Sequence, residues 1–554
     1  MTTICEKENP CLVADWETLQ RIFIRPENDA CRKTLVKYME QILFGLNDFL
    51  KCNVGITEEI SLKDLTLDFQ DTMISKNPEK KLADVISDLI NRIAPWAVNV
   101  ASPYFVGHMT AAIPFFMVHL KVIAAALNQN VVKLETSKVL SVLERQVLAK
   151  IHRLIFKQNE AFYKRHVQSI DTSLGVFTTG GTTANLTALW VARNRFFRPF
   201  DHGDGCGFNG IENQGIFAAF KAYSIERAVI LVSRRGHFSL KKAGGILGIG
   251  NSNVIPVDVD AKQRMNVKEL ENIIKSLKKN KTTGIISVIG IAGATETGTI
   301  DPLCDIADIC REHSINFHVD AAWGGPVLLS DRYSCLLTGI EKADSVTIDA
   351  HKQFYLPMTS GMVYFKDPGA MDFISYHSNY VNREGSVDLG IKSLEGSREA
   401  NSMILDSALK IMGTRGYALM IDHGIETAEE FAREISKREL FELVTEPELN
   451  ILTYRIVPPY LKAKISCFDL QGKNKIQSTI EIQNAIDQIN IIVQRKQREA
   501  GKSFVSRTRI RRRPSDKHSI VVLRSVIMNP MTNIEILKDI LDEQEEIFNS
   551  LHDF

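Results

Sequence analysis

The stretch NFHVDAAWGGPVLLSDRYSCLLTGIEKADSVTIDAHKQF, residues 316–354, contains two short apolar runs that each lead to an ionisable residue. The first run ends at Asp320, and the second is followed within a few residues by Lys352. Runs of this length and composition predict short buried strands. In open α/β sheets the ligand crevice lies at the carboxyl ends of the strands, so we expect Asp320 and Lys352 to converge on one pocket.

An acid and an amine in one pocket meet the needs of pyridoxal phosphate (PLP). The lysine amine forms a Schiff base with the aldehyde of PLP, and the carboxylate keeps the pyridine nitrogen protonated. The alternative is a buried aspartate and an exposed lysine that have no relation to each other. Because a lone buried charge is costly, the pair favours a PLP site at Asp320 and Lys352.

Small and hydroxyl residues follow a second apolar strand, in GVFTTGGTTANLTALWVARN, residues 175–194. The turn contains Gly181, Thr182 and Thr183 and opens an amphipathic helix, whose free backbone N–H groups suit a phosphate. A tight strand–helix turn without a ligand is the alternative. The turn matches neither a Walker A motif nor G-x-G-x-x-G, which favours a single phosphate over a nucleotide.

Two more strand ends carry candidate ligand-binding residues. Ala228–Val232 predicts a buried strand, and His237 follows it where a helix begins, so it could stack on a flat ring or serve only as a helix cap. The strand predicted over 284–289 leads into the loop that contains Thr295. The alternation of strand, loop and helix from 175 to 366 predicts a mostly parallel sheet with helices on both faces, an α/β fold.

The remaining segments divide the chain into three regions. We expect an N-terminal helical region over 1–130, a large PLP-binding domain over 131–405 and a small C-terminal α+β domain over 406–554. In the first region, the apolar stretch Ala111–Leu127 is interrupted by polar residues and predicts a buried helix at a subunit contact rather than a membrane span. The pattern over 135–155 predicts one helix. The arginine-rich stretch 507–513 predicts a solvated loop between strands.

Composition places the chain among ordinary globular proteins. It has 554 residues, enough for two or three domains, and a net charge of +1, which gives no reason to expect nucleic acid or an anionic membrane as a partner. None of its nine cysteines forms a C-x-x-C pair, so we expect reduced thiols and no metal site. The first residues, MTTICEKENP, do not have the pattern of a secretory signal, and we expect a cytoplasmic protein.

Five segments together resemble the group II PLP-dependent decarboxylases, the fold type I enzymes that include glutamate, aromatic amino acid and histidine decarboxylases. The segments are TTGGTTANLTALWVAR, SRRGHFSLKKAGGILGIG, GATETGTIDP, HVDAAWGGP and DSVTIDAHKQ. They occur in the family's order. Within the family, NVASPYFVGHM, LNQNVVKLETSK and FVSRTRI most resemble the bacterial PLP-dependent aspartate 1-decarboxylases.

The resemblance implies roles for individual residues. Lys352 matches the Schiff-base lysine, Asp320 the acid on the pyridinium nitrogen, Ala322 the small residue against the ring, and His237 the histidine that stacks on the ring and handles protons. Further cofactor contacts are implied for Thr295, Gly181, Thr182, Thr183 and His351. One position departs from the family: Asp349 stands where members often have an asparagine or serine that donates to the phosphate.

The resemblance also implies residues at the substrate end. Arg524 matches an arginine that pairs bidentately with the substrate carboxylate, and His108 is expected to shape the side-chain pocket. The segment 371–398 has the composition of a mobile loop; in the family such a loop carries a tyrosine that protonates the carbon after CO2 leaves. Tyr380 matches it best, and Tyr376 is second.

The expected function is PLP-dependent decarboxylation of an acidic amino acid, with aspartate giving β-alanine. Glutamate decarboxylation to γ-aminobutyrate, another PLP reaction such as aromatic decarboxylation or transamination, and a catalytically inactive scaffold are the alternatives. The family implies a homodimer whose active sites lie at the subunit interface.

Overall fold

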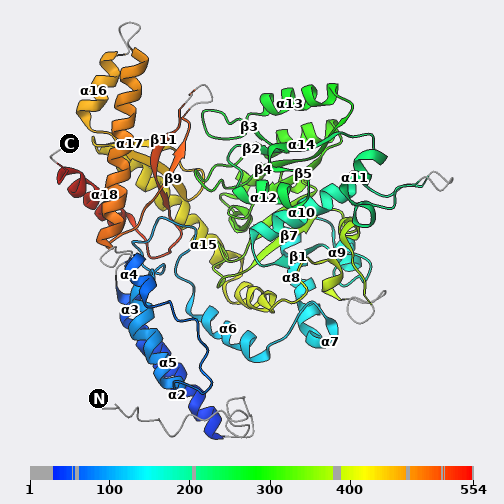
Figure 1. Ribbon diagram of the computed structural model, residues 1–554, viewed down its shortest axis with the longest axis horizontal. Coiled ribbons are helices and arrows are strands. Elements are labelled where there is room, and N and C mark those ends of the chain that lie inside the picture. Colours follow the sequence, from blue (N-terminus) through cyan, green and yellow to red (C-terminus); the bar gives the residue numbers. More distant parts are fainter. Residues whose placement is uncertain are drawn as a thin grey trace, which may run out of the picture.

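A seven-stranded sheet forms the centre of the protein in a computed structural model (Figure 1). The structure describes residues 29–52, 54–55, 62–201, 207–378, 388–468, 475–512, 516 and 518–551. The strands lie in the order β1-β7-β6-β5-β4-β2-β3, and β7 runs in the direction opposite to the other six. Their bounds are β1 Gly175–Thr178, β2 Arg227–Ser233, β3 Val254–Val257, β4 Thr283–Ile291, β5 Asn316–Asp320, β6 Ser345–Asp349 and β7 Gly361–Phe365. This confirms the expected mostly parallel α/β fold.

Helices cover both faces of this sheet. Successive side chains of a strand point to opposite faces, and here the side chains on both faces are apolar and need a helix to cover them. In β2, Val229 and Leu231 pack with one group of helices, whereas Ala228 and Ile230 pack with the other. The first group is α8 (Val139–Phe156), α13 (Val267–Lys279) and α14 (Leu303–Glu312), and the second is α10 (Gly181–Phe196), α11 (Ile211–Ala222) and α12 (Phe238–Ile246). Burial on both faces explains why these strands read as nearly continuous apolar runs.

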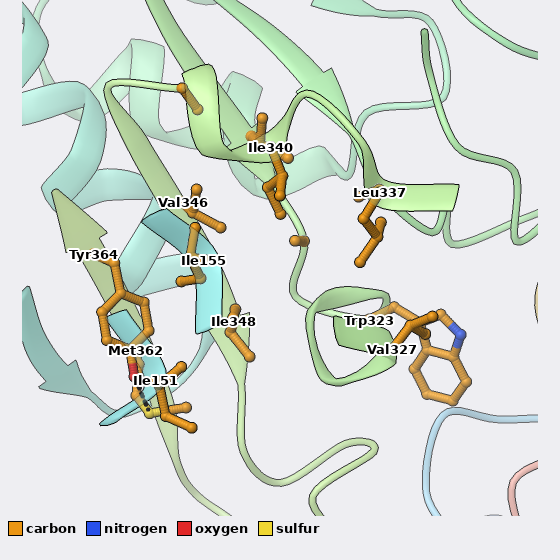
Figure 2. Packing of buried hydrophobic residues seen from close by; sticks show 14 of the residues in the cluster. Ile151, Ile155, Trp323, Val327, Leu337, Ile340, Val346, Ile348, Met362 and Tyr364 are labelled. Carbon is orange, nitrogen blue, oxygen red and sulfur yellow. Dashed lines mark hydrogen bonds between the residues drawn. The ribbon is translucent and has the colours of Figure 1, made fainter. Parts of the chain in front are cut away.

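The apolar side chains of the stretch 316–354 form a large part of the core on the α8 face of the sheet (Figure 2). Ile151 and Ile155 of α8 pack with Val346 and Ile348 of β6, and Trp323 lies at the far side of the same cluster. The strand ends that carry Asp320 and Asp349 are therefore supported by well-packed apolar side chains. Close packing of this kind holds strand ends in fixed positions.

The N-terminal helices form an arm that projects from the body (Figure 1). They are α2 (Asp29–Gly45), α3 (Asn47–Lys51), α4 (Leu62–Leu67), α5 (Leu82–Asp88) and the short helices η1 (Leu89–Ile93) and η2 (Ala94–Trp96). After the arm come α6 (Phe115–Leu127), α7 (Leu134–Ser137), α8 and α9 (Glu160–His166). The prediction of one helix over 135–155 is wrong, because Lys138 has a φ of +43° and separates α7 from α8.

The C-terminal part forms a second, four-stranded antiparallel sheet in the order β10-β11-β9-β8. Its strands are β8 (Phe441–Thr445), β9 (Ile451–Ile456), β10 (Ser506–Ile510) and β11 (Ile520–Val526). The helices around it are α15 (Asn401–Lys437), α16 (Pro459–Phe468), α17 (Lys475–Ala500) and α18 (Ile534–Asn549). The boundary expected at 405/406 falls within α15, which kinks at Gly413.

The prediction of a solvated loop over 507–513 is wrong for the first part of this stretch, which is a strand. Arg507 and Arg509 lie on β10, an edge strand of the small sheet. Arg507 donates to the carbonyl of Ile491, and Arg509 pairs with Asp487 at 3.2 Å. Both partners belong to α17, so these arginines fasten that helix over the sheet edge. Among the described residues, no helix is both long enough and apolar enough to cross a membrane.

Candidate functional site

Polar side chains of β5 and β6 gather on the α10 face of the sheet. In β5, Phe317 and Val319 enter the core on the α8 side, so strand alternation turns His318 and Asp320 toward α10. In β6 the same alternation turns Asp349 toward α10. Two carboxylates thus lie on one face, at the carboxyl ends of neighbouring parallel strands, as the sequence predicted for the ligand crevice.

Asp320 is buried and held by two donors. Its Oδ2 accepts from Nδ2 of Asn185 at 2.9 Å, and its Oδ1 accepts from the backbone N–H of Ala322 at 3.1 Å. Asn185 lies on α10, where its carbonyl oxygen is 3.1 Å from Nε2 of His318. Because the amide nitrogen faces Asp320, the oxygen must accept, so Nε2 of His318 carries a proton. Burial lowers the pKa of His318 to about 4, which keeps the ring neutral.

Lys352 lies in the loop after β6, where its amine meets a carboxylate. Its Nζ is 3.2 Å from Oδ2 of Asp349, and the same oxygen is 3.8 Å from Nε2 of His351. Nδ1 of His351 lies 2.7 Å from the carbonyl of Ser360. The other carboxylate oxygen of Asp349, Oδ1, is buried without a hydrogen-bond partner among the described residues.

The glycine–threonine turn at the start of α10 lies against Asp349. A Cβ at Gly181 would be 2.8 Å from Oδ2 of Asp349, and one at Gly361 would be 2.8 Å from its Oδ1. Gly181 therefore leaves room for this carboxylate, and Gly361 leaves room both for it and for the backbone of Gly180, which the same Cβ would approach to 2.5 Å. The hydroxyls of Thr179 and Thr183 are 3.0 Å apart across the turn. The first-turn N–H groups of a helix have no partners within the helix, so this turn offers donors for an anion.

His237 caps α12 and also lines the cavity, so it is not only a helix cap, and its stacking on a ring stays a prediction. Its Nδ1 accepts from the backbone N–H of Ser239, which leaves Nε2 available to a ligand. Ser239 in turn contacts Asn185 at 3.3 Å, linking His237 to the partner of Asp320. Burial lowers the pKa of His237, and the carboxylate of Asp320 opposes that shift.

One cavity of about 410 Å³ connects these groups. Nine of the residues expected at the site line it: Lys352, Asp320, His237, Ala322, Thr295, Gly181, Thr182, Thr183 and His351. Its wall also includes Thr179, Gly180, Asn185, Ile291, Gly293, Trp323, Asp349 and Thr359. The structure therefore brings together every residue expected to contact the cofactor.

Arg524 lies on β11 of the small sheet, behind the cavity wall at Thr295. Its Nε donates to the carbonyl of Thr295 at 2.6 Å, and its Nη1 donates to the carbonyl of Gly107 at 3.1 Å and to the hydroxyl of Ser506 at 3.2 Å. Its Nη2 is buried without a partner among the described residues. Protein acceptors occupy Nε and Nη1, so Nη2 is the guanidinium nitrogen left for the substrate carboxylate, and the bidentate pairing stays a prediction.

Two further ionisable groups surround Arg524. Burial lowers the pKa of Arg524 to about 10, so it stays charged at neutral pH, and the nearby carboxyl of Glu296 opposes this shift. His108 is exposed and is not among the residues that line the cavity. Partial burial, followed by the positive charges of Arg524 and Lys352, lowers the pKa of His108. An anionic ligand between these three groups would offset that repulsion.

The two candidate tyrosines differ in what can be said of them. Tyr380 lies outside the described residues. Tyr376 is half exposed, donates a hydrogen bond to Glu212 and packs near Trp190, and it does not line the cavity. The hydrogen bond to Glu212 raises the pKa of Tyr376 to about 12.

The residues of the cavity fit PLP. A buried, doubly hydrogen-bonded carboxylate stands at one end, helix N–H groups and threonine hydroxyls stand at the other, and a lysine amine lies between strand ends. Ala322, a small residue, and His237, which carries a flat ring, also line the cavity. Only Asp349 is at odds with a phosphate, because its orphaned Oδ1 would repel a second anion.

Sequence reasoning missed several residues at the site. Asn185 is the clearest example, since a fully buried amide on the sheet-facing side of α10 is a polar residue where the helix pattern calls for an apolar one. That interruption was a readable signal. Gln353 and Asn450, which bond to Trp323 behind the cavity wall, gave no signal, because only the fold brings them together.

Comparisons with known proteins agree with this geometry. Residues 66–457 match the pyridoxal-dependent decarboxylase conserved domain. The aspartate 1-decarboxylase of Aliivibrio fischeri is 45% identical over 543 residues, which cover 98% of this chain and 96% of that protein. The acidic amino acid decarboxylase of Bos taurus is 28% identical over 444 residues, covering 78% of this chain and 77% of the relative.

Solved structures show the same fold. The crystal structure of Oryza sativa TDC with PLP and tryptamine superposes with a TM-score of 0.78 at 15% identity, covering 96% of this chain and all of that one. At this identity the likeness concerns the fold alone.

Proposed function

The chain belongs to the pyridoxal-dependent decarboxylase family, and we propose that it removes the α-carboxyl group of aspartate to give β-alanine and CO2. Supporting this choice of substrate is the 45% identity, over nearly the whole of both chains, to an aspartate 1-decarboxylase. The positive charges of Arg524 and Lys352, which both act on His108, suit a substrate that carries two carboxylates.

We assign the cofactor's contacts from the residues that line the cavity. Lys352 would attach to the aldehyde carbon, Asp320 would pair with the pyridine nitrogen, and the turn at Gly181–Thr183 would receive the phosphate. When bound, PLP supplies an electron-accepting ring that takes up the electron pair of the broken bond. Asn185 and the N–H of Ala322 hold the Asp320 carboxylate in place, which keeps its charge directed at one ring atom.

Arg524 is the proposed anchor for a substrate carboxylate. Its guanidinium is fixed by Thr295 and Gly107, so Nη2 presents its two N–H groups from a rigid position. Fixing the substrate sets the direction of the bond that breaks, and orientation of this kind can contribute several kcal/mol. His108, whose pKa is lowered by burial and by its cationic neighbours, is the proposed partner of the side-chain carboxylate.

The return of a proton to the α-carbon needs an acid on the open side of the site. We assign this step to Tyr380, with His237 as the second candidate through its available Nε2. Replacing Tyr380 with phenylalanine would then slow product formation without weakening cofactor binding. Tyr376→Phe is the matched control, since Tyr376 is held by Glu212 away from the cavity.

A panel of the standard amino acids tests the proposed function directly. Purified protein loaded with PLP is incubated with each amino acid, and CO2, amine and keto acid are measured. The proposal predicts equimolar CO2 and β-alanine from aspartate, with Lys352→Ala as the inactive control. If glutamate gives γ-aminobutyrate, or an aromatic amino acid gives its amine, the proposed substrate is wrong. Keto acid without CO2 would show transamination in place of decarboxylation. No visible cofactor absorbance would indicate an inactive scaffold.

We further propose a homodimer with active sites near the subunit contact. The α6 helix exposes Phe115, Val118, Val122 and Ile123, an apolar face that a second copy would cover. An apolar groove on this face includes Pro357, and the next residues lead to Thr359 in the cavity wall. A second copy would therefore border the site. Light scattering should give twice the chain mass, and Val122→Asp should reduce it to one chain.

We propose a cytoplasmic location, in line with the cysteine pattern. The cysteines whose side chains are described, Cys52, Cys304, Cys310 and Cys335, form no disulfides with one another. Reduced thiols of this kind are typical of a reducing compartment. Cell fractionation, with markers for membrane and soluble fractions, tests the location.

A further inference from the structure

Three buried residues form a closed ring of hydrogen bonds beside the cavity, through their side chains and the backbone carbonyl of Trp323. Nε1 of Trp323 donates to Oδ1 of Asn450 at 3.0 Å, and Nδ2 of Asn450 lies 3.4 Å from Oε1 of Gln353. Nε2 of Gln353 donates to the carbonyl of Trp323 at 2.8 Å, which completes the ring. All three residues are at most 2% exposed, so solvent cannot replace a lost partner.

Each member of the ring belongs to a segment that carries a different site residue. Trp323 follows Asp320 by three positions and lines the cavity. Gln353 directly follows Lys352. Asn450 belongs to the small domain, immediately before β9. The ring therefore joins two strand ends of the large sheet to the start of a strand in the small one.

Asn450 is also tied to the segment that carries Arg524. The side-chain Nδ2 of Asn450 donates to the backbone carbonyl of Ile527 at 2.9 Å. The backbone carbonyl of Asn450 accepts from the backbone N–H of Ile527 at 2.8 Å. Ile527 follows β11, three residues after Arg524. In the sheet register Arg524 lies opposite Thr453, three residues after Asn450. The position of Arg524 thus depends on the same β9–β11 pairing that Asn450 begins.

The surrounding structure leaves this contact little freedom. A Cβ at Gly424 of α15 would lie 2.9 Å from the carbonyl of Ile527 and 3.3 Å from Nδ2 of Asn450, so the helix closes over the contact. A second link runs parallel to the ring, since the hydroxyl of Tyr355 donates to the carbonyl of Met528 at 2.7 Å. Both links connect the residues just after Lys352 with the residues just after β11.

We propose that Asn450 is a positioning residue that sets the distance between the amine of Lys352 and the guanidinium of Arg524. The first group acts at the reacting carbon and the second holds a substrate carboxylate, so their separation determines how the substrate is oriented. Lys352 lies in the loop after β6 and Arg524 lies on β11 of the other sheet, so no single helix or strand fixes the distance between them. This proposal rests on the family's decarboxylation reaction and on Arg524 as the carboxylate anchor, and it does not depend on aspartate as the substrate.

Asn450→Asp tests the ring with almost no change in size. The new carboxylate still accepts from Trp323, but it places an oxygen against the oxygens of Ile527 and Gln353, which opens the ring. Asn490→Asp is a matched control, because Asn490 is equally buried and donates to the carbonyls of Ile456 and Ile486 while accepting from the N–H of Ile456. It therefore holds the opposite end of β9, away from the cavity.

We expect Asn450→Asp to lower kcat/KM by about 10- to 100-fold, through a higher KM and a lower kcat, with the amount of bound PLP unchanged. Asn490→Asp should stay within about twofold of wild type when both are assayed below their melting temperatures. If Asn450→Asp does not fold, Gln353→Met opens the other side of the ring without altering the small domain and should show the same split.

Two results would overturn the proposal. One is kinetic constants of the Asn450 and Gln353 variants that match those of wild type or of Asn490→Asp. The other is loss of bound PLP with an unchanged KM, which would place the effect at the cofactor. The assay uses the amino acid that wild type decarboxylates fastest. If that amino acid is not aspartate, the substrate proposal fails, but the comparison of the variants with wild type still tests the role of Asn450. If wild type turns over none, amino acid binding measured by cofactor absorbance replaces the rates.

Discussion

The carboxylate of Asp349 lies 3.2 Å from the amine of Lys352, at the point where the glycine–threonine turn of α10 offers its N–H groups. The carboxylate is almost completely buried, and one of its oxygens has no hydrogen-bond partner among the described residues. Lys352 therefore has an anionic neighbour on the same side as the proposed phosphate position. Two anions this close repel each other strongly in a buried setting.

Asp349→Asn should strengthen PLP binding by about tenfold, which corresponds to about 1.4 kcal/mol. The amide has nearly the same shape, loses the negative charge and gains a donor for the phosphate. Titration of cofactor-free protein with PLP, followed by absorbance, measures the dissociation constant. Asp372→Asn is the matched control, because Asp372 also pairs with a lysine, Lys392, but at the exposed surface. Weaker PLP binding in Asp349→Asn would mean that this carboxyl contributes a favourable contact.

Lys352→Ala should abolish turnover and remove the covalent attachment of PLP. The lysine amine is the only one among the cavity-lining residues of the described chain. Reduction with borohydride followed by mass spectrometry should label wild type at the peptide that contains Lys352 and leave the variant unlabelled. Lys410→Ala, at an exposed ion pair on α15, should behave as wild type. Normal activity of Lys352→Ala would contradict the proposed mechanism.

Asp320→Asn should retain part of the bound PLP yet lower kcat by at least about 100-fold. The amide still fills the space beside Asn185 and Ala322, but it has no charge to keep the pyridine nitrogen protonated. PLP content and kcat are therefore measured on the same preparation. A kcat within a few-fold of wild type would remove Asp320 from this role.

The fold and the cofactor end of the site could be predicted from local sequence. Apolar runs that end in Asp320 and Asp349, and a small-residue turn that opens α10, are properties of neighbouring residues, and the structure brings them to one cavity. Parallel strands carry out that step, because their carboxyl ends lie at one edge of a sheet.

The substrate end could not be predicted in detail, because it depends on contacts between distant segments. The donors of Arg524 are used by Thr295 and Gly107, which precede it by more than two hundred residues. Asn450 joins Trp323 and Gln353 only after the small sheet packs against the large one. The positive φ of Lys138 was missed because the polar residues of α7 that precede it are also compatible with the first turn of a helix that continues from Val139.

Arg524→Lys should raise KM by about tenfold or more with a smaller effect on PLP binding. Lysine keeps the charge, but its single ammonium cannot serve Thr295, Gly107 and a substrate carboxylate from one rigid plane. Steady-state kinetics and PLP titration separate the two effects. Arg509→Lys, on the exposed edge strand β10, is the control. An unchanged KM would place the substrate carboxylate elsewhere.

His318 should make the folded protein less stable as the pH falls from about 6.5 to 4. Burial lowers the folded-state pKa of His318 to about 4, whereas an unfolded histidine titrates near 6.5. Below pH 6.5 the unfolded chain takes up a proton that the folded chain excludes. Stability is therefore fully present above the unfolded pKa, declines between the two values and levels off below the lower one.

His318→Gln removes this titration while keeping an amide that can reach Asn185. We expect the variant to melt at a lower temperature than wild type at pH 7.5, because the hydrogen bond to Ser345 is lost. Between pH 7.5 and 5 its melting temperature should fall less than that of wild type. Scans at one fixed protein concentration measure the difference, with His518→Gln, at an exposed position before β11, as the control. Parallel pH profiles of His318→Gln and wild type would mean that His318 takes up its proton without unfolding.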